Sequence, residues 1–121
     1  MRKKVLFIDD DPTILLISKL MLEDLGYDVL TAEGGIIGIE ILKKSNNIDL
    51  ILLDLMMPDI YGIDVLKWIK KDQKFKHIPV ILQTGVQISN DIMDTAREFS
   101  NVHVLLKPYD KEALNDVLKE L

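Results

Sequence analysis

Five short runs of apolar residues, each closed by polar residues, alternate along the chain with stretches that have helical spacing. The apolar runs lie at about 4–9, 27–31, 48–53, 78–83 and 102–106. Such runs are typical of strands that are buried on both faces of a parallel sheet. A strict alternation of strands and helices implies right-handed crossovers that place helices on both faces. The pattern therefore predicts an α/β fold with a five-stranded parallel, doubly wound sheet and five helices, in one domain over residues 1–121.

The first predicted helix has clear signals at both ends. Asp11 can cap it, Pro12 suits its first position, and Gly26 ends it. We expect a wide face of this helix to be buried, made of Ile14, Leu15, Ile17, Leu20, Met21, Leu22 and Leu25. The second predicted helix, over about 34–44, is weakened by three glycines. Gly38 is best explained by a close approach of this helix to the sheet.

The remaining helices are predicted over about 62–72, 89–99 and 110–121. Ser89 or Asn90 can cap the fourth helix, and Asp110 can cap the fifth. The fifth helix should turn one apolar stripe inward, made of Ala113, Leu114, Val117, Leu118 and Leu121.

Composition and charge narrow the possible functions. The 121 residues carry a net charge of −5 and the pI is near 4.9, which argues against a nucleic-acid partner. A cluster of lysines is interpreted as a solvated helix face and loop; it consists of Lys67, Lys70, Lys71, Lys74 and Lys76. Cysteine is absent, which excludes disulfides and thiolate metal sites. Because no signal-peptide core or membrane-spanning run is found, we expect a cytoplasmic protein without a membrane partner.

Four of the apolar runs end in residues that can carry chemistry. Asp9 and Asp10 follow the first run, Asp54 follows the third, Thr84 the fourth and Lys107 the fifth. The carboxyl ends of parallel strands meet at one edge of the sheet, where ligands of open α/β sheets bind. Three carboxylates gathered there repel one another unless a cation joins them, and oxygen ligands favour Mg²⁺, Mn²⁺ or Ca²⁺. The pattern thus predicts a divalent metal site.

Asp54 closes the most apolar run, where a buried carboxylate is costly unless it is paired or metal-bound. It could be a metal ligand, a nucleophile or both, because aspartate is an established covalent acceptor of phosphoryl groups. The hydroxyl of Thr84 and the ammonium group of Lys107 suit the oxygens of a transferred phosphoryl group. Asp11, by contrast, is assigned to helix capping.

Ordered motifs along essentially the whole chain resemble those of the response-regulator receiver domains of two-component signalling. The matching segments are 5–12 (VLFIDDDP), 52–59 (LLDLMMPD), 61–64 (YGID), 81–85 (ILQTG) and 105–109 (LLKPY). Each segment alone is moderately specific, whereas the ordered set is a strong indication. The resemblance, rather than the apolar pattern, implies the flavodoxin-like strand order 2-1-3-4-5.

The resemblance also implies roles for the residues at the strand ends. Asp54 would accept a phosphoryl group from a phosphohistidine of a sensor histidine kinase or a histidine phosphotransfer protein. The metal would be Mg²⁺, held directly by Asp10 and chiefly through water by Asp9. Asp54 itself and the backbone carbonyl of Met56 would complete the protein's share of the ligands.

Thr84 would hydrogen-bond the phosphoryl group, Lys107 would pair with it, and the Lys107–Pro108 bond would be cis. Movement of these loops would shift the surface of the fourth helix, fifth strand and fifth helix, and so signal to a downstream protein. Such a chain is a switch rather than an enzyme and dephosphorylates itself slowly at most. Met56 and Val86 flank the predicted phosphoryl position without offering a base, so we expect a long-lived phosphorylated state.

One position departs from the pattern of the family. Three residues before the lysine, the family usually has an aromatic residue or histidine that reports phosphorylation, and this chain has Val104. His103 cannot simply replace it, because neighbouring strand residues face opposite sides of a sheet. Gly85 stands where alanine is commoner, which would loosen the loop after Thr84. We therefore expect the output signal to be weaker or differently routed.

Two alternative functions stay open at this point. A phosphohydrolase of the haloacid-dehalogenase type would use Asp9 as its aspartate nucleophile, with Asp11 in the same motif and Thr84 as its second motif. That hypothesis leaves Asp54 unexplained and lacks an acidic motif after Lys107. The other alternative is a receiver-like interaction module that is not phosphorylated, which the intact strand-end residues argue against.

Overall fold

The computed structural model describes residues 2–85 and 89–121, in which strands and helices alternate strictly. The strands are β1 (Lys4–Asp9), β2 (Asp28–Glu33), β3 (Leu50–Asp54), β4 (Val80–Thr84) and β5 (Val102–Leu106). The helices are α1 (Pro12–Asp24), α2 (Gly35–Lys44), α3 (Gly62–Lys71), α4 (Asn90–Arg97) and α5 (Lys111–Leu118). Each predicted strand and helix is present near its expected position.

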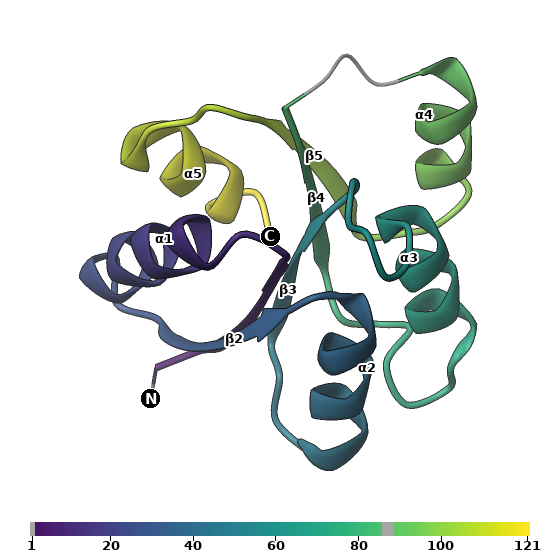
Figure 1. Ribbon diagram of the computed structural model, residues 1–121, viewed down its shortest axis with the longest axis horizontal. Helices are drawn as coiled ribbons and strands as arrows, with labels where there is room; N and C mark the ends of the chain where they lie inside the picture. Colours follow the sequence, from purple (N-terminus) through teal and green to yellow (C-terminus); the bar gives the residue numbers. More distant parts are fainter. Residues whose placement is uncertain (1, 86–88) are drawn as a thin grey trace.

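The strands form one parallel sheet in the order β2-β1-β3-β4-β5. Figure 1 shows α1 and α5 on one side of this sheet and α2, α3 and α4 on the other. The predicted doubly wound architecture and the strand order are therefore confirmed. The strand order reverses between β1 and β3, because the chain adds β2 on one side of β1 and β3 on the other. In such folds, ligands bind in the crevice beside the carboxyl ends of the strands at this point.

Local sequence signals set the ends of the helices. The Asp11 side chain accepts hydrogen bonds from two backbone N–H groups in the first turn of α1. Ser89 and Asp110 each accept one such bond at the starts of α4 and α5. Gly26 follows α1 with φ of +99°, a left-handed conformation that glycine adopts without strain. The predicted caps are confirmed.

Helix α2 differs from these helices because its cap comes from another part of the chain. Its N-cap residue is Gly34, with φ of +121° and no side chain to accept a hydrogen bond. Asp59, in the connection between β3 and α3, accepts bonds from the N–H groups of Gly35 at 3.3 Å and Ile36 at 3.0 Å. The loop that follows Asp54 is thereby tied to the start of α2.

A hydrophobic cluster lies on each face of the sheet, because alternate residues of a buried strand point to opposite sides. Ile8 and Leu53 belong to the cluster that includes residues of α2, α3 and α4, whereas Phe7 and Leu52 belong to the cluster of α1 and α5. A Cβ atom on Gly38 would lie 2.5 Å from Cδ1 of Ile8. The close approach of α2 to the sheet that we expected at this glycine is confirmed.

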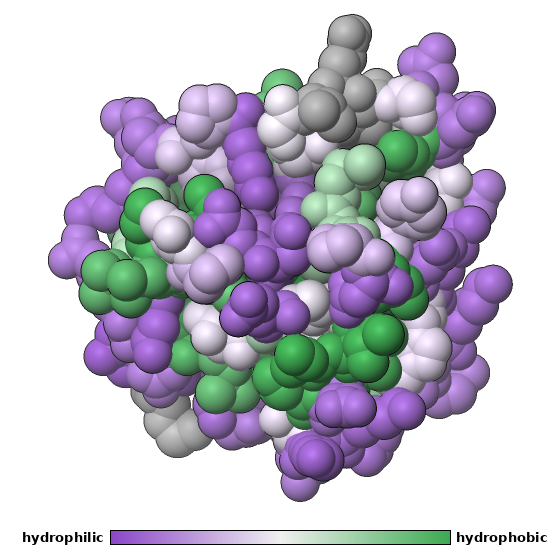
Figure 2. All heavy atoms as spheres, viewed as in Figure 1, coloured by the Kyte–Doolittle hydropathy of each residue, from purple (hydrophilic) through white to green (hydrophobic). Residues whose placement is uncertain are grey.

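The buried stripe of α1 is narrower than its sequence suggests. Leu15 and Leu22 are buried, but Ile17 and Leu20 are 52% and 59% exposed. Figure 2 shows apolar atoms reaching the surface over α1, at the left of the view. The prediction of a wide buried face is wrong because the sheet and α5 cover only part of the helix (Figure 1). Leu121 was expected in the inward stripe of α5, but it follows the helix and is 40% exposed.

One lysine of the predicted solvated cluster is buried instead. Lys70 lies in the last turn of α3, and its Nζ donates hydrogen bonds to the carbonyls of Lys76 at 3.0 Å and Ile78 at 2.8 Å. Burial lowers the pKa of Lys70 below its usual value. Lys71 and Lys74 are exposed, as expected. The solvated interpretation is wrong for Lys70, because folding supplies carbonyl acceptors that the charge pattern does not reveal.

Candidate functional site

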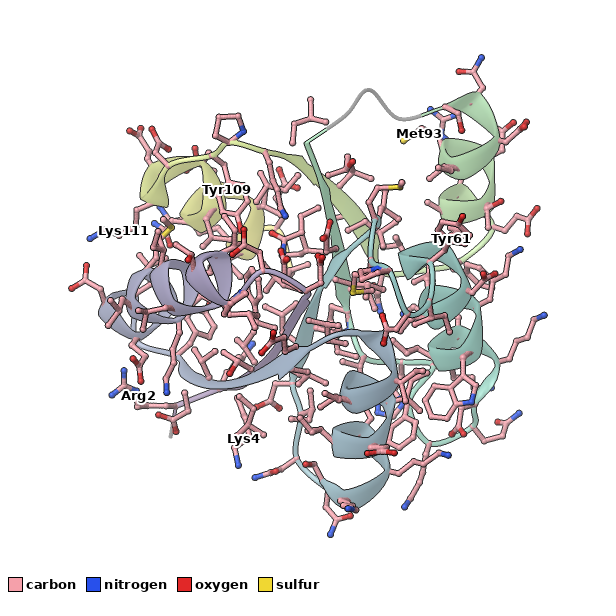
Figure 3. All side chains as sticks on the ribbon, in the orientation of Figure 1. Arg2, Lys4, Tyr61, Met93, Tyr109 and Lys111 are labelled. Atoms are coloured by element: carbon pink, nitrogen blue, oxygen red, sulfur yellow. The ribbon has the colours of Figure 1, made fainter. Side chains whose placement is uncertain are left out.

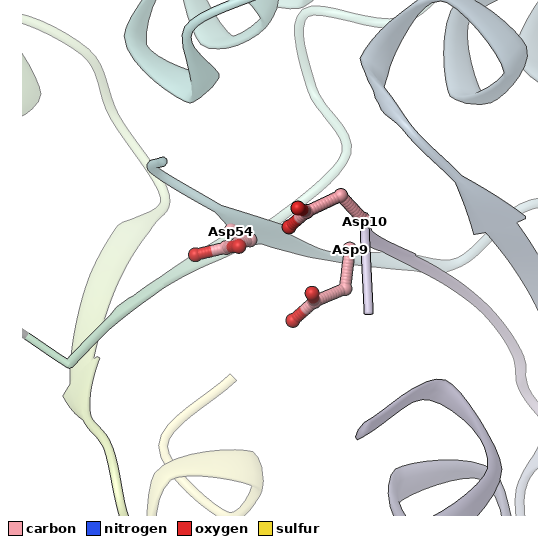
Figure 4. Close-up of side chains that lie close together, drawn as sticks. All are labelled: Asp9, Asp10 and Asp54. Carbon is pink, nitrogen blue, oxygen red and sulfur yellow. The ribbon is translucent and has the colours of Figure 1, made fainter. Parts of the chain in front are cut away.

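The carboxyl ends of β1 and β3 bring three carboxylates together. Asp9 ends β1, Asp10 follows it, and Asp54 ends the neighbouring strand β3. One oxygen of each side chain lies within 4.8 Å of the others (Figure 4). Asp9 and Asp54 are buried, whereas Asp10 is more exposed. The predicted convergence of these three residues is therefore present in the fold.

Both carboxylate oxygens of Asp9 are engaged. Oδ2 accepts a hydrogen bond from Nζ of Lys107 at 2.8 Å, and Oδ1 accepts one from the backbone N–H of Asp11 at 3.0 Å. The same Nζ lies 3.6 Å from Oδ1 of Asp54. A single ammonium group thus serves two carboxylates, and it joins the segment after β5 to two strands that are not its neighbours in the sheet.

Asp54 is 6% exposed and sits in an unfavourable environment for a charge. Burial and, after it, the Asp9 carboxylate together raise its pKa to about 6, against the opposing effects of Lys107 and the N–H of Met56. The N–H of Met56 is 3.4 Å from Oδ1 of Asp54, a long hydrogen bond. The Asp54 carboxylate would gain stability from any ligand that brings positive charge to this crevice.

The ends of β4 and β5 bring Thr84 and Lys107 to the same edge of the sheet. Thr84 is buried at the end of β4, and its carbonyl accepts a hydrogen bond from the backbone N–H of Lys107 at 2.8 Å. The Lys107–Pro108 peptide bond is cis, which confirms that prediction. The two residues that were expected to contact a phosphoryl group are therefore fixed relative to one another through their backbones.

The donor set of the crevice fits Mg²⁺. Carboxylate oxygens are the ligands that this hard cation prefers, and it usually keeps several waters beside one or two carboxylates. Three carboxylates face one ammonium group, so the cluster has an excess of negative charge that a divalent cation would balance. The Met56 side chain is exposed beside this cluster; the role of its carbonyl as a ligand stays a prediction.

The two strand residues considered for a switch leave β5 on opposite sides. Val104 packs against the cluster that includes residues of α4, whereas Nδ1 of His103 lies 3.8 Å from a carboxylate oxygen of Glu120, just after α5. His103 therefore does not occupy the place of Val104, as expected. Val86, which we predicted beside the phosphoryl position, lies outside the described residues.

Two polar residues near the site were not singled out from the sequence. Gln83 is fully buried in β4, and its Oε1 accepts a 2.6 Å hydrogen bond from the hydroxyl of Tyr109. Burial, with smaller contributions from the charges of Asp9 and Asp54, raises the pKa of Tyr109 to about 12, although a hydrogen bond with Ser18 opposes the shift. The signal that could have revealed this pair is a glutamine inside an otherwise apolar strand.

Comparison with known proteins identifies the family. The family model for the response regulator receiver domain matches residues 5–119. Chemotaxis protein CheY-3 of Vibrio cholerae is 33% identical over 119 residues, which are 98% of this chain and 90% of that protein. The polar-differentiation response regulator DivK of Brucella ovis is 31% identical over 91 residues, which are 75% of this chain and 73% of that protein.

Solved structures agree with the sequence relatives. Chemotaxis protein CheY4 of Vibrio cholerae superposes with a TM-score of 0.90 at 27% identity, covering 99% of this chain and 98% of that one. A receiver domain protein from Clostridium thermocellum has a TM-score of 0.82 at 34% identity, covering 98% and 92%. Among the described residues, no helix is long and apolar enough to cross a bilayer. The chain belongs to the response-regulator receiver-domain family, and hence to the proteins of two-component signalling.

Proposed function

We propose that this chain is a cytoplasmic, Mg²⁺-dependent switch that accepts a phosphoryl group on Asp54. The donor would be a phosphohistidine of a sensor histidine kinase or a histidine phosphotransfer protein. The observation that carries the proposal is the position of Asp54, buried among carboxylates and 3.6 Å from the ammonium group of Lys107. This environment disfavours a bare carboxylate and favours one that gains a cation or a covalent group.

In the transfer step, an oxygen of Asp54 attacks the phosphorus atom in line with the bond to the histidine nitrogen. The new O–P bond forms while the N–P bond breaks, and the imidazole nitrogen leaves with the electron pair. A pKa of about 6 leaves Asp54 mostly ionised at neutral pH, as a nucleophile requires. When bound by Asp9, Asp10, Asp54 and the Met56 carbonyl, Mg²⁺ would supply positive charge that offsets the phosphoryl oxygens.

Lys107 and Thr84 would then respond to the new group. Phosphorylation replaces the single negative charge of the Asp54 carboxylate with a larger group that carries roughly −1.5 to −2. In the unphosphorylated chain, the Lys107 ammonium group donates a 2.8 Å hydrogen bond to Asp9. It would need only a short movement to reach the phosphoryl oxygens. The Thr84 hydroxyl would donate a hydrogen bond to another of these oxygens. Both movements shift the loops after β4 and β5 and bias the surface formed by α4, β5 and α5 toward a downstream protein.

The phosphorylated state would be long-lived, because turnover requires a base that activates water. The apolar side chain of Met56 is exposed beside Asp54 and offers no such base. The chain would therefore act as a stoichiometric phosphoacceptor and not as an enzyme with an external substrate. An acyl-phosphate half-life of many minutes or longer at neutral pH is the expected result, and a half-life of seconds would contradict it.

The alternative of a hydrolase with its catalytic aspartates at Asp9 and Asp11 has less support. The side chain of Asp11 caps α1, and both oxygens of Asp9 accept hydrogen bonds within the fold. Neither carboxylate is as poorly compensated as that of Asp54. The second alternative, an unphosphorylated interaction module, predicts that nothing at this crevice responds to phosphoryl donors.

Phosphoryl uptake from acetyl phosphate in the presence of Mg²⁺ tests the proposal. Intact-mass measurement should show one added phosphoryl group on the wild-type chain and none on Asp54→Ala. Asp9→Ala should take up the group more slowly but still reach Asp54. If Asp54→Ala is labelled and Asp9→Ala is not, the hydrolase is favoured; if the wild-type chain stays unlabelled, the interaction module is. Asp116→Ala, an exposed position on α5, is the matched control and should behave as wild type.

A further inference from the structure

A buried polar contact links the phosphoacceptor crevice to the groove beside α1. The Tyr109 hydroxyl donates a 2.6 Å hydrogen bond to Oε1 of Gln83, a residue with no exposed surface. Figure 3 shows Tyr109 beside α5, on the side of the sheet that carries α1 and α5. Tyr109 packs against the largely apolar cluster of α1 and α5, and the buried Ser18 is its second hydrogen-bond partner.

Gln83 lies directly beside the phosphoacceptor. In the parallel register of β3 and β4, Asp54 is paired with Gln83. Leu52 and Ile81, two residues before each of them, belong to the cluster of α1 and α5, so the side chains of Asp54 and Gln83 point to that same face. A change of charge on Asp54 therefore occurs next to the Gln83 amide.

The Gln83 amide also has a donor to spare. Its Nε2 is buried and has no hydrogen-bond partner among the residues that the structure describes. An unpaired buried donor is uncommon and costs the fold stability unless something uses it. A phosphoryl group on Asp54 would bring additional acceptor oxygens to this side of the sheet.

Tyr109 forms part of a groove that this polar contact can affect. A cavity of about 160 Å³ lies between α1 and the segment after β5, and it is lined by Ile14, Ile17, Ser18, Met21, Lys107 and Tyr109, among others. Tyr109 is two residues after Lys107, the group expected to move on phosphorylation. The groove wall is thus connected to the crevice twice, through Gln83 and through the chain itself.

On the other face of the sheet, the β5 residue at the usual switch position is apolar. There β5 contributes Val104, an aliphatic residue packed against the cluster that includes residues of α4. An aliphatic side chain cannot form a hydrogen bond that depends on the state of the crevice. Polar coupling on the α1 and α5 side therefore offers a route that does not need an aromatic residue at Val104.

We propose that Gln83 and Tyr109 form a polar relay that couples the charge state of Asp54 to the groove between α1 and the segment after β5. The relay rests on the proposed function, because phosphorylation of Asp54 is its input. In the unphosphorylated chain, Gln83 holds the Tyr109 hydroxyl. On phosphorylation, the Gln83 amide turns its free donor to the phosphoryl group, and Tyr109 follows it and reshapes the groove. Gln83 and Tyr109 are positioning residues in this scheme, and neither reacts.

Amide chemical shifts measured before and after addition of Mg²⁺ and beryllofluoride, a phosphoryl mimic, test the relay. Asp54 and Thr84 report on the site, and Ser18 and Met21 report on the groove. In the wild-type chain both pairs should shift. In Tyr109→Phe and in Gln83→Met, which keeps the side-chain shape, the site shifts should persist while the groove shifts fall at least twofold. The double variant should lose no more than either single variant.

Tyr27→Phe is the matched control, because Tyr27 packs against the same cluster of α1 and α5, away from the crevice. It removes a hydroxyl and should leave all four shifts as in wild type. Groove shifts that stay at the wild-type size in both Gln83→Met and Tyr109→Phe, with the site shifts present, overturn the relay alone. A wild-type chain without any site response overturns the proposed function and the relay with it. Should Tyr109→Phe fail to fold, Gln83→Met still decides the question.

Discussion

Two buried charged groups lie at opposite ends of the sheet, and their surroundings differ. Lys70 is at the end of α3 near the start of β4, and its ammonium group donates hydrogen bonds to the carbonyls of Lys76 and Ile78. Asp54 is at the carboxyl end of β3, where two other carboxylates lie within 4.8 Å. Burial shifts the pKa of each group toward its neutral form, downward for Lys70 and upward for Asp54.

The difference between them separates a structural charge from a functional one. The partners of Lys70 are neutral carbonyls supplied by the fold itself, so the group is complete without a ligand. Asp54 shares its ammonium group, at 3.6 Å, with Asp9, accepts one long hydrogen bond, and has two other carboxylates within 4.8 Å. Burial alone therefore does not mark a functional site. A functional site is marked by a buried charge that its protein neighbours do not stabilise, at the edge of the sheet where ligands bind.

The largest effect is expected from Lys70→Met, which tests whether this charge is structural. The variant keeps the apolar stem but leaves the carbonyls of Lys76 and Ile78 without their donor, which should lower the free energy of unfolding by about 3 kcal/mol. Urea denaturation measures the change. Lys71→Met, on the exposed side of the same turn, should cost less than about 0.5 kcal/mol. Equal effects of the two variants would remove the distinction drawn for Lys70.

Addition of Mg²⁺ tests whether a bound cation stabilises the buried Asp54 carboxylate. At roughly thirtyfold excess over its dissociation constant, Mg²⁺ should raise the free energy of unfolding by about 2 kcal/mol, and chelation should reverse this. Lys70→Met should respond as the wild-type chain does, because its charge lies at the other end of the sheet. Asp10→Asn should respond weakly. A wild-type chain that gains nothing over NaCl of equal ionic strength would contradict the metal assignment.

Asp54→Asn tests the electrostatic cost directly, in buffer without divalent cations. Because the folded pKa of Asp54 is raised to about 6, ionisation of this group opposes folding as the pH rises from about 4 to 6. The variant should exceed the wild-type chain in unfolding free energy by about 1 kcal/mol at pH 7, a value reduced by solvent screening. The difference should be small near pH 4, grow to about pH 6 and then level off. If the difference in unfolding free energy shrinks as the pH rises, the raised pKa of Asp54 is contradicted.

Asp59→Ala sharpens the comparison, because Asp59 is a carboxylate at the same edge that backbone N–H groups already stabilise. Burial is the largest single influence on the pKa of Asp59 and raises it, but the hydrogen bonds from the N–H groups of Ile36, Gly35 and Ile60 together outweigh burial and lower the pKa. Its removal should cost about 0.5–1 kcal/mol, as for the loss of a helix cap. The contribution is present above the ordinary Asp pKa and lost as the pH falls through the lower folded value.

Amide hydrogen exchange at Gly35 and Ile36 in α2 is the direct readout for this cap. Exchange should accelerate in Asp59→Ala and stay nearly as slow in Asp59→Asn, which keeps an acceptor oxygen. Unchanged exchange in Asp59→Ala would mean that water satisfies these N–H groups equally well.

Much of the fold could be predicted from local patterns. The apolar runs identified the strands, and the caps at Asp11, Ser89 and Asp110 identified helix starts, because these signals act over a few residues. The ordered strand-end residues predicted which side chains would meet, and Asp9, Asp10 and Asp54 do meet. Their assigned roles in phosphoryl transfer are the subject of the experiments above.

The errors concern residues whose environment depends on distant parts of the chain. Ile17 and Leu20 were expected to be buried, and their exposure follows from how little of α1 the sheet and α5 cover. Lys70 was expected in solvent and is held by carbonyls from the next segment. Helical periodicity shows which residues share a face, but it does not show how much of that face a neighbour covers.

The sequence by itself determined the alternation of strands and helices, the local caps and the set of residues that meet at the carboxyl edge. These features depend on period, composition and the rule that parallel strands end at a common edge. Only the tertiary structure decided that Lys107 pairs with Asp9, that Asp59 caps α2 and that Tyr109 reaches Gln83. Each of these contacts joins side chains and backbone groups from separate elements, and their distances depend on how the helices pack on the sheet.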